Sequence, residues 1–254
     1  MPRDWDAATY HRLSEPQRRW GKALVDRLAL RGDERVLDAG CGSGRVTAMI
    51  LERLPEGSVV AMDGSASMVD AARETLAPFG DRVTYVVGDL LDPIPIEPVD
   101  AVFSNATFHW IRDHEALFRA LRTVMRPGAR LVAQCGGKGN VAEWVSVVKE
   151  LTAREPYAEH LRDVSAWNFY GPEETEERLR AAGFTDIRTE LVEVPKVRPD
   201  DPREFARTVG LAAHLDALPE ELRDQFTDDV VTGMENPFEL TYIRLNIDAT
   251  AGNP

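Results

Sequence analysis

The sequence predicts an α/β protein built on a doubly wound sheet with helices on both faces. Two observations support this prediction. Strand-like apolar runs alternate with helically spaced apolar residues between about 33 and 136. The stretch "VLDAGCGSGRVTAMILERL", from Val36 to Leu54, passes from a strand through three glycines into a helix. Because ligands of such sheets gather beyond the carboxyl ends of the strands, this glycine turn marks the expected binding crevice.

Size and charge limit the classes of function. The chain has 254 residues, 43% of them hydrophobic, so we expect one domain over 1–254, with material for a cap. Its 30 Lys and Arg residues face 43 Asp and Glu residues, giving a formal charge of −13. A broad basic surface for nucleic acid is therefore not expected, and a small molecule is the expected partner.

Targeting and metal signals are weak throughout the chain. The first residues lack the apolar core of a signal peptide, and no run reaches the roughly 18 apolar residues of a membrane span. We therefore expect a cytoplasmic protein that does not bind membranes. Cys41 and Cys135 are too few for a disulfide framework, and no metal-ligand spacing surrounds them, so no metal is expected.

The individual elements follow in order along the chain. Ser14 and Pro16 suit the start of a helix over about 15–30. After the glycine turn, strands are expected at 58–63, 83–89, 99–105 and 129–135, with helices near 66–77 and 113–125. Beyond Gly136, helices are expected over 141–155, 170–184, 201–213 and 219–233, and strands over 185–194 and 238–248.

Three segments are expected to cover the crevice. Residues 1–32 form an N-terminal cap segment, and residues 139–168 plus 200–235 form helical lid insertions. The alternative is that these helices simply pack against the edge of the sheet.

The glycine spacing bears on which nucleotide binds. A dinucleotide fingerprint that starts at Gly40 and Gly42 needs glycine at position 45, where this chain has Arg45. Asp63 ends the second strand, 19 residues after Gly44, where its carboxylate could accept hydrogen bonds from both ribose hydroxyls. A nucleoside-containing ligand other than a dinucleotide is therefore favoured over a nicotinamide cofactor.

Four strand ends together resemble those of class I S-adenosylmethionine-dependent methyltransferases: "VLDAGCGSG", "VVAMD", "VVGDL" and "VFSNATFHW". The resemblance implies S-adenosyl-L-methionine as cofactor and a seven-stranded sheet of order 3-2-1-4-5-7-6 with the last strand antiparallel. Carried over to this sequence, it implies that the methionine end of the cofactor is bound by Asp38, Gly40 and Asn105. The ribose is then bound by Asp63 and the adenine by Asp89 and Leu90, and Gly42 belongs to the cofactor-binding loop. Each of these residues also has a structural alternative, such as bracing the turn or capping a helix.

A narrower resemblance concerns the acceptor. "DWDAATYHRLSEPQ", "NATFHW" and "PFELTYIRL" are similar to the trans-aconitate and malonyl-acyl-carrier-protein methyltransferase group. This implies O-methylation of a small carboxylate by in-line displacement, with Tyr10 closing over the methyl group. An ionised carboxylate needs no general base. A hydroxyl or amine acceptor would benefit from one, and His109, just beyond the fourth strand, is the first candidate.

The acceptor pocket is expected to include Trp110, Trp144 and Tyr170, with core packing as the alternative for each. A protein that binds S-adenosylmethionine without catalysis is a further alternative. The sequence selects neither the basic residue that would bind an anionic acceptor nor an oligomeric state.

Overall fold

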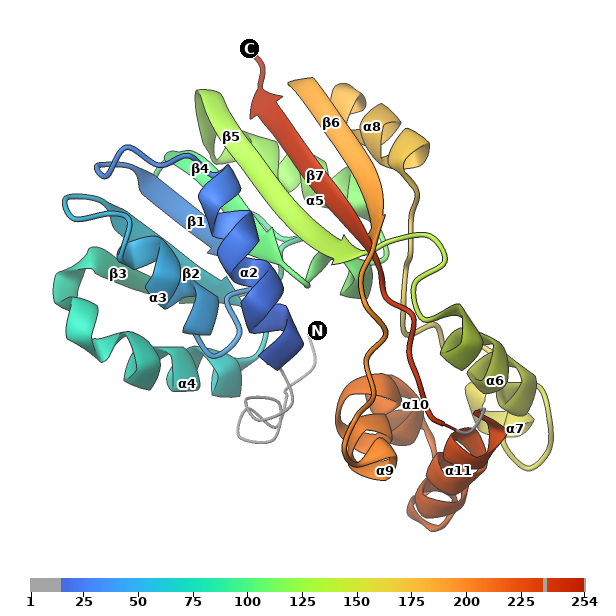
Figure 1. Ribbon diagram of the computed structural model, residues 1–254. Coiled ribbons are helices and arrows are strands. Elements are labelled where there is room, and N and C mark those ends of the chain that lie inside the picture. The colour runs from blue at the N-terminus through green and yellow to red at the C-terminus, as the bar shows by residue number, and fades with distance from the viewer. Residues whose placement is uncertain (1–14, 235–236, 254) are drawn as a thin grey trace.

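A seven-stranded mixed sheet forms the centre of the computed structural model, which describes residues 15–234 and 237–253 and, within 15–20, the backbone alone (Figure 1). The strand order is β3-β2-β1-β4-β5-β7-β6, and β7 runs antiparallel to both of its neighbours. The predicted order and the antiparallel last strand are confirmed. The strands are β1 (Arg35–Ala39), β2 (Ser58–Asp63), β3 (Val83–Val87), β4 (Val99–Asn105), β5 (Met125–Gly136), β6 (Phe184–Glu193) and β7 (Ile243–Ala251).

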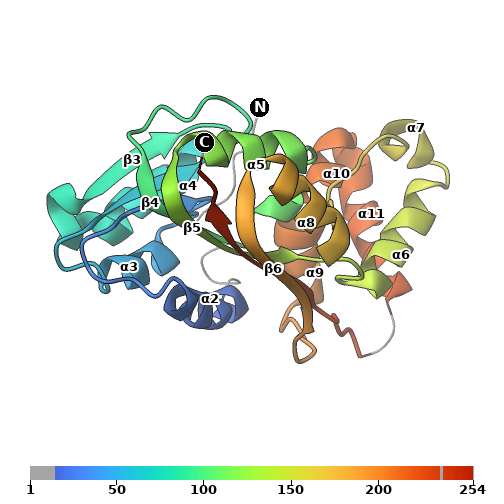
Figure 2. The same cartoon turned by 90° about the horizontal axis from the view of Figure 1, so that it is seen from above.

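Helices cover both faces of the sheet, as Figure 2 shows for α2 and α3 on one side and α5 on the other. One face carries α2 (Glu15–Arg27), α3 (Arg45–Leu51) and α4 (Ala66–Leu76), and the other carries α5 (His114–Thr123) and α8 (Pro172–Ala181). Neighbouring residues of β1 enter different cores, because successive strand side chains point to opposite faces: Val36 joins the α2–α4 core and Leu37 the α5–α8 core. The near-continuous apolar strands of the sequence are thus explained by burial on both faces.

A separate group of helices, which we call the helical unit, lies beyond one end of the sheet (Figure 1). It contains α6 (Ala142–Thr152), α7 (Ala158–Leu161), α9 (Pro202–Phe205), the π-helical turn η3 (Ala206–Gly210), α10 (Ala212–Ala217) and α11 (Glu220–Gly233). These elements share their own apolar core, in which the Tyr157 and Phe226 rings lie 4.8 Å apart. None of the described helices is long and apolar enough to cross a membrane.

The structure corrects the sequence-based elements at two places. The predicted helix over 201–213 is broken into α9, η3 and α10, and a Cβ at Gly210 would lie 2.4 Å from the Trp144 ring. The chain at Gly210 therefore packs directly on an indole. The last strand begins at Ile243 instead of 238, and before it Leu240 makes an isolated bridge to Val197.

The N-terminal segment is described only in part. Residues 1–14, including Tyr10, lie outside the described residues. Helix α2 packs on the sheet through Leu24 and Val25, which are buried in the same core as Val36 of β1, and Leu28 directly after the helix joins the same core.

Truncating Phe118 tests the α5 side of the core. Its ring is fully buried and lies edge-to-face with Phe108 at 6.0 Å. We expect Phe118→Ala to lower the free energy of unfolding by about 3–5 kcal/mol in urea titrations, because a cavity replaces the ring. Val87→Ala, at a side chain 54% exposed, should change it by less than about 0.5 kcal/mol. Equal effects of the two substitutions would contradict this account of the core.

Candidate active site

The loop after β1 has the backbone conformation of a close-approach turn. Gly40, Gly42 and Gly44 have φ values of 90°, 52° and 82°, which favour glycine. A Cβ at Gly40 would lie 2.0 Å from Thr107 Oγ1, so packing alone requires glycine there. A Cβ at Gly42 would meet no described atom within 4 Å. Gly42 therefore faces open space that a ligand can approach.

Asp63 ends β2 beside this loop. Its Oδ2 accepts the Gly42 backbone N–H at 2.9 Å, and its Oδ1 accepts the Ser65 N–H at 2.9 Å. Burial raises the pKa of the carboxyl group, while these N–H donors act in the opposite direction. A carboxylate has about four acceptor sites, so Asp63 retains capacity to accept hydroxyl groups from a ribose beside these backbone donors.

Asp38 is placed differently from Asp63. Its side chain is buried, with the residue 2% exposed, and Oδ2 accepts the Thr47 hydroxyl of α3 at 2.6 Å. Burial, against the opposing effect of the Thr47 hydroxyl and with a smaller contribution from the nearby Asp63, raises the pKa of this carboxyl group to about 7. Asp38 thus ties the glycine loop to α3. A cation held close to it would favour its ionised form.

The end of β3 offers a surface for an adenine base. Asp89 Oδ1 accepts the Leu91 N–H at 3.0 Å. The Leu90 side chain is buried in the core, which leaves its backbone as the part available to a base. Val87 and Leu91 flank Asp89 and are among the exposed large hydrophobic residues of the described chain. The sequence did not indicate these two apolar side chains as part of the site, because an exposed and a buried apolar residue look the same in a sequence.

The segment after β4 lies between the glycine loop and a separate hollow, which is described in the next paragraph. Asn105 ends β4, and Ala106 follows with a φ of 68°, an uncommon conformation for a residue with a Cβ. The Thr107 hydroxyl donates to the Gly40 carbonyl at 3.3 Å. Since Ala106 also lines the hollow, the proposed cofactor crevice and the hollow share a wall.

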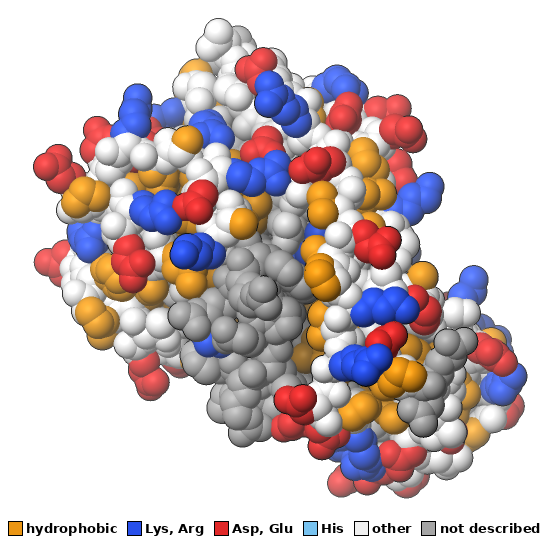
Figure 3. All heavy atoms as spheres, viewed as in Figure 1, with side chains coloured by type: hydrophobic (Ala, Val, Ile, Leu, Met, Phe, Trp, Pro, Cys, Tyr) orange, Lys and Arg blue, Asp and Glu red, His pale blue; other side chains and the backbone are white. Residues whose placement is uncertain are grey.

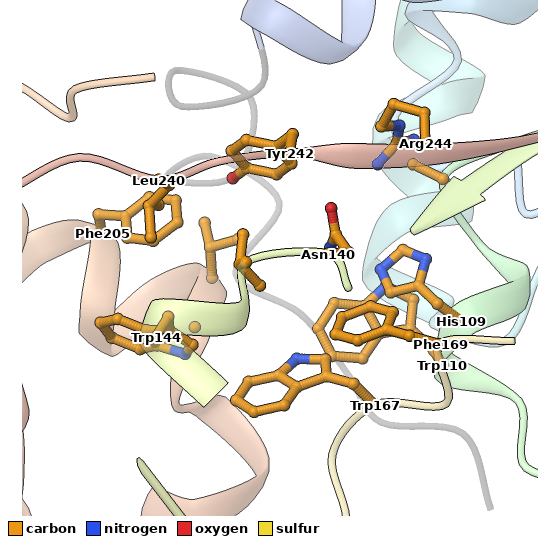
Figure 4. Close-up of a pocket in the computed structure, with 14 residues that line it drawn as sticks. His109, Trp110, Asn140, Trp144, Trp167, Phe169, Phe205, Leu240, Tyr242 and Arg244 are labelled. Carbon is orange, nitrogen blue, oxygen red and sulfur yellow. The ribbon is translucent and has the colours of Figure 1, made fainter. Parts of the chain in front are cut away.

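This hollow, which we call the acceptor pocket, lies between the sheet and the helical unit and contains about 590 Å³ of empty space, part of which is open to solvent. Figure 4 shows the fourteen residues that line it. Most are aromatic or aliphatic: Ala106, Trp110, Val141, Trp144, Trp167, Phe169, Phe205, Val209, Gly210, Leu240 and Tyr242. The predicted pocket residues Trp110 and Trp144 are both among them.

Three further lining residues supply hydrogen-bond donors. Arg244 on β7 is only 3% exposed, and its Nε donates to Gln134 Oε1 at 3.3 Å. Asn140 accepts the Ile243 N–H on Oδ1 at 3.0 Å, so its amide nitrogen remains as the donor. No Asp or Glu is among the described residues that line the pocket, and Arg244 is the one Lys or Arg among them. In a chain with 43 acidic residues, this favours an anionic ligand.

His109 is the third donor. It is 8% exposed, and burial together with the smaller effects of Arg244 and His114 lowers its pKa to about 3. Its Nδ1 accepts the Gly136 backbone N–H at 3.4 Å. We assign the proton of the neutral ring to Nε2 on the basis of this hydrogen bond. In this tautomer the Nε2–H of His109 is available to donate a hydrogen bond, and the ring is poorly suited to remove a proton.

The structure places Tyr170 outside the pocket, contrary to expectation. Its hydroxyl donates to the Arg112 carbonyl at 3.0 Å, and the Arg178 guanidinium lies 3.9 Å from its ring centroid. Trp167 and Phe169, two residues apart in the same segment, both line the pocket instead. In an extended segment alternate residues share one side, so Tyr170 faces the other way.

Sequence reasoning also missed Arg244, Asn140 and Tyr242. One signal was present: in "LTYIRL", Leu240, Tyr242 and Arg244 occupy alternate positions and so share one side of an extended chain. Asn140 had no comparable signal, because a turn between β5 and α6 brings it to the pocket.

Comparison with known proteins agrees with this geometry. Residues 36–128 match a family described as a methyltransferase domain. An uncharacterized methyltransferase, C70.08c, of Schizosaccharomyces pombe is 33% identical over 217 residues, which cover 82% of this chain and 81% of the relative. The trans-aconitate 2-methyltransferase of Acidovorax sp. JS42 is 26% identical over 88% of this chain and 86% of its own length. That of Azoarcus sp. BH72 is 36% identical over 51% of this chain and 50% of the relative.

Among solved structures, the YcgJ protein of Bacillus subtilis superposes with a TM-score of 0.66 at 16% identity, over 93% of this chain and all of that one. The family match and the relative of Schizosaccharomyces pombe therefore define the protein as a methyltransferase. More particularly, the chain belongs to the class I S-adenosylmethionine-dependent methyltransferases.

Replacing Asp63 tests the ribose site. We expect Asp63→Ala to weaken S-adenosylmethionine binding by about 2–4 kcal/mol in calorimetry, because two charge-assisted hydrogen bonds are lost. The control is Asp70→Ala, which removes an exposed carboxylate that pairs with Arg73 on α4. Unchanged affinity in a folded Asp63→Ala protein would remove Asp63 from the site.

Asp38 should make stability depend on pH. Its folded pKa of about 7 lies above the ordinary value of about 3.9, so stability falls as pH rises from about 4 to 7. We expect Asp38→Asn to be more stable than the wild type at pH 8, by up to about 4 kcal/mol, and the difference to vanish near pH 4. Thermal unfolding across this range measures it. Parallel pH profiles for the two proteins would show that Asp38 ionises normally.

Proposed function

We propose that this methyltransferase transfers a methyl group from S-adenosyl-L-methionine to a carboxylate oxygen of a small molecule. The observation that carries the proposal is the buried Arg244, which lines an acceptor pocket with no acidic residue among its described lining. A buried guanidinium is costly to maintain and suits bidentate binding of a carboxylate. The relatives named trans-aconitate 2-methyltransferase support the same reaction type.

The proposed cofactor site uses residues that fit the ligand. Asp63 would hold the ribose hydroxyls, Asp89 and the Leu90 backbone the adenine, and Gly40 and Asn105 the methionine end. The open space over Gly42 leaves room for it. When bound there, S-adenosyl-L-methionine supplies an electrophilic methyl group on a sulfonium.

The acceptor side would work by charge and position. Arg244 neutralises the carboxylate, while the Nε2–H of His109 and the amide of Asn140 orient it toward the wall that the pocket shares with the crevice. We further propose that the helical unit acts as a lid, since its residues form the apolar side of the pocket and would exclude water. An ionised carboxylate attacks without losing a proton, so no base is needed.

The alternative is methylation of a hydroxyl or amine with His109 as the general base. The lowered pKa of His109 and the Gly136 N–H on its Nδ1 both oppose this role. The fold does not choose between acceptors, because a phosphoethanolamine N-methyltransferase of Haemonchus contortus superposes with a TM-score of 0.60 at 20% identity, over 92% of this chain and 53% of its own. The other alternative is a protein that binds S-adenosylmethionine without catalysis. Such a protein would give no reason for a pocket lined with hydrogen-bond donors.

Two substitutions test the proposal. We expect Arg244→Gln to lower kcat/KM for a carboxylate acceptor by about 10²-fold or more, while S-adenosylmethionine still binds. His109→Gln keeps an uncharged donor and should retain turnover within about tenfold, with little change between pH 6 and 8. If His109 were the base, turnover would instead fall about 10²–10⁴-fold.

The matched control is Arg154→Gln, which removes an exposed arginine that pairs with Glu150 on the helical unit. It should leave kcat/KM unchanged. A wild-type rate that rises through a histidine-like ionisation, together with a hundredfold loss in His109→Gln, would overturn the carboxylate proposal.

A further inference from the structure

The acceptor pocket is polar at one end and apolar at the other. Leu240, Tyr242 and Arg244 alternate along the segment that leads into β7. Figure 4 shows them in a row, with Arg244 at the end near His109 and Leu240 at the end near Phe205. At about 3.3 Å per residue the row spans roughly 13 Å. The pocket therefore suits an elongated acceptor with one charged end.

The apolar end is built from packed aromatic rings. Trp144 is 2% exposed, and its ring lies so close to the Gly210 backbone that no Cβ fits between them. Phe205 lies edge-to-face with Trp144 at 6.1 Å. Trp167 and Phe169 stack with their planes 5° apart and their centroids at 6.3 Å, and Phe169 in turn stacks on His109 at 5.8 Å, so this pair forms the wall that leads to the polar end. These walls are held by the core of the helical unit, so they exist before any acceptor binds.

The charge distribution limits how many carboxylates an acceptor can carry. Among the described lining residues Arg244 is the one cation, and its place is at the polar end. A second carboxylate on an elongated acceptor would lie among the rings of Trp144 and Phe205. There the Trp144 Nε1–H is a neutral donor, but no described lining residue supplies a counter-charge for an ionised group that loses its hydration. An apolar body at the same place would instead remove aromatic surface from water.

We infer that the natural acceptor is an amphipathic monocarboxylic acid, whose carboxylate binds at Arg244 and whose aryl or alkyl body extends toward Trp144. The inference rests on the proposed function and separates this chain from an enzyme for small polycarboxylates. In the reaction one carboxylate oxygen forms the bond to the methyl carbon, and the electron pair of the broken carbon–sulfur bond goes to sulfur. The products are a methyl ester and S-adenosylhomocysteine, and no proton moves.

An acceptor series tests the inference with the purified full-length chain and radiolabelled S-adenosylmethionine. The series contains trans-cinnamate, octanoate, butyrate, trans-aconitate and cinnamyl alcohol, with mass analysis of each product. We expect kcat/KM for trans-cinnamate or octanoate to exceed that for trans-aconitate at least 100-fold, and that for octanoate to exceed butyrate about 10- to 100-fold. Calorimetry on the protein saturated with S-adenosylhomocysteine should give the same order of affinities.

The outcomes separate the two proposals. Preference for trans-aconitate would overturn the monocarboxylate inference and leave carboxylate methylation intact. Methylation of cinnamyl alcohol but of no acid would overturn both. Failure of trans-cinnamate and octanoate to bind in calorimetry would overturn the inference even without turnover data.

A pair of variants then locates the apolar body. Phe205→Ala should lower kcat/KM for octanoate about tenfold and leave butyrate within about twofold, because the shorter acid does not reach the ring. Phe226→Leu is the control, since Phe226 is buried in the same helical unit but does not line the pocket. It should lower the melting temperature without changing the octanoate-to-butyrate ratio. Equal loss for both acids in Phe205→Ala would count against the inference.

Discussion

The close approach of the loop after β1 to the segment after β4 is the constraint on which both halves of the site depend. Thr107 packs against Gly40 so tightly that no side chain fits there, and its hydroxyl donates to the Gly40 carbonyl. This contact fixes the position of Ala106, which carries an unfavourable positive φ and lines the acceptor pocket. The strained backbone of Ala106 is thus held in place by the packing of the residues around it. The position of Ala106 in turn sets the distance between the crevice and the pocket.

The cofactor crevice and the acceptor pocket differ in the charge of the groups around them. Around the glycine loop, the buried Asp38 and the half-buried Asp63 are acids whose pKa values lie above their ordinary range. Around the acceptor pocket, burial and, to a smaller extent, the nearby Arg244 lower the pKa of His109 and keep its ring neutral. The electrostatic potential therefore favours a cationic ligand at the glycine loop and an anionic ligand in the acceptor pocket, and it opposes binding of either ligand at the other site.

The sheet could be predicted from the sequence because each parallel strand carries a continuous apolar run and ends in a recognisable motif. The glycine loop and Asp63 followed from the same signal, since strand ends of a parallel sheet converge. That Arg244 and Phe205 line the same pocket could not be predicted, because it depends on how the helical unit docks against β7. Tyr170 was misplaced for a related reason: the pairing partner of an extended segment, and hence which side faces the pocket, is a tertiary property.

Arg244 stands on a strand that follows all others in the described chain and yet lies inside the sheet, between β5 and β6. During synthesis β6 has no strand to pair with until residues 243–251 have left the ribosome. Completion of the hydrogen-bonded ladder and arrival of the guanidinium proposed to bind the acceptor are therefore one event. Under the proposed function, a partly made chain that lacks β7 also lacks the acceptor site, so recognition of the acceptor is coupled to closure of the sheet.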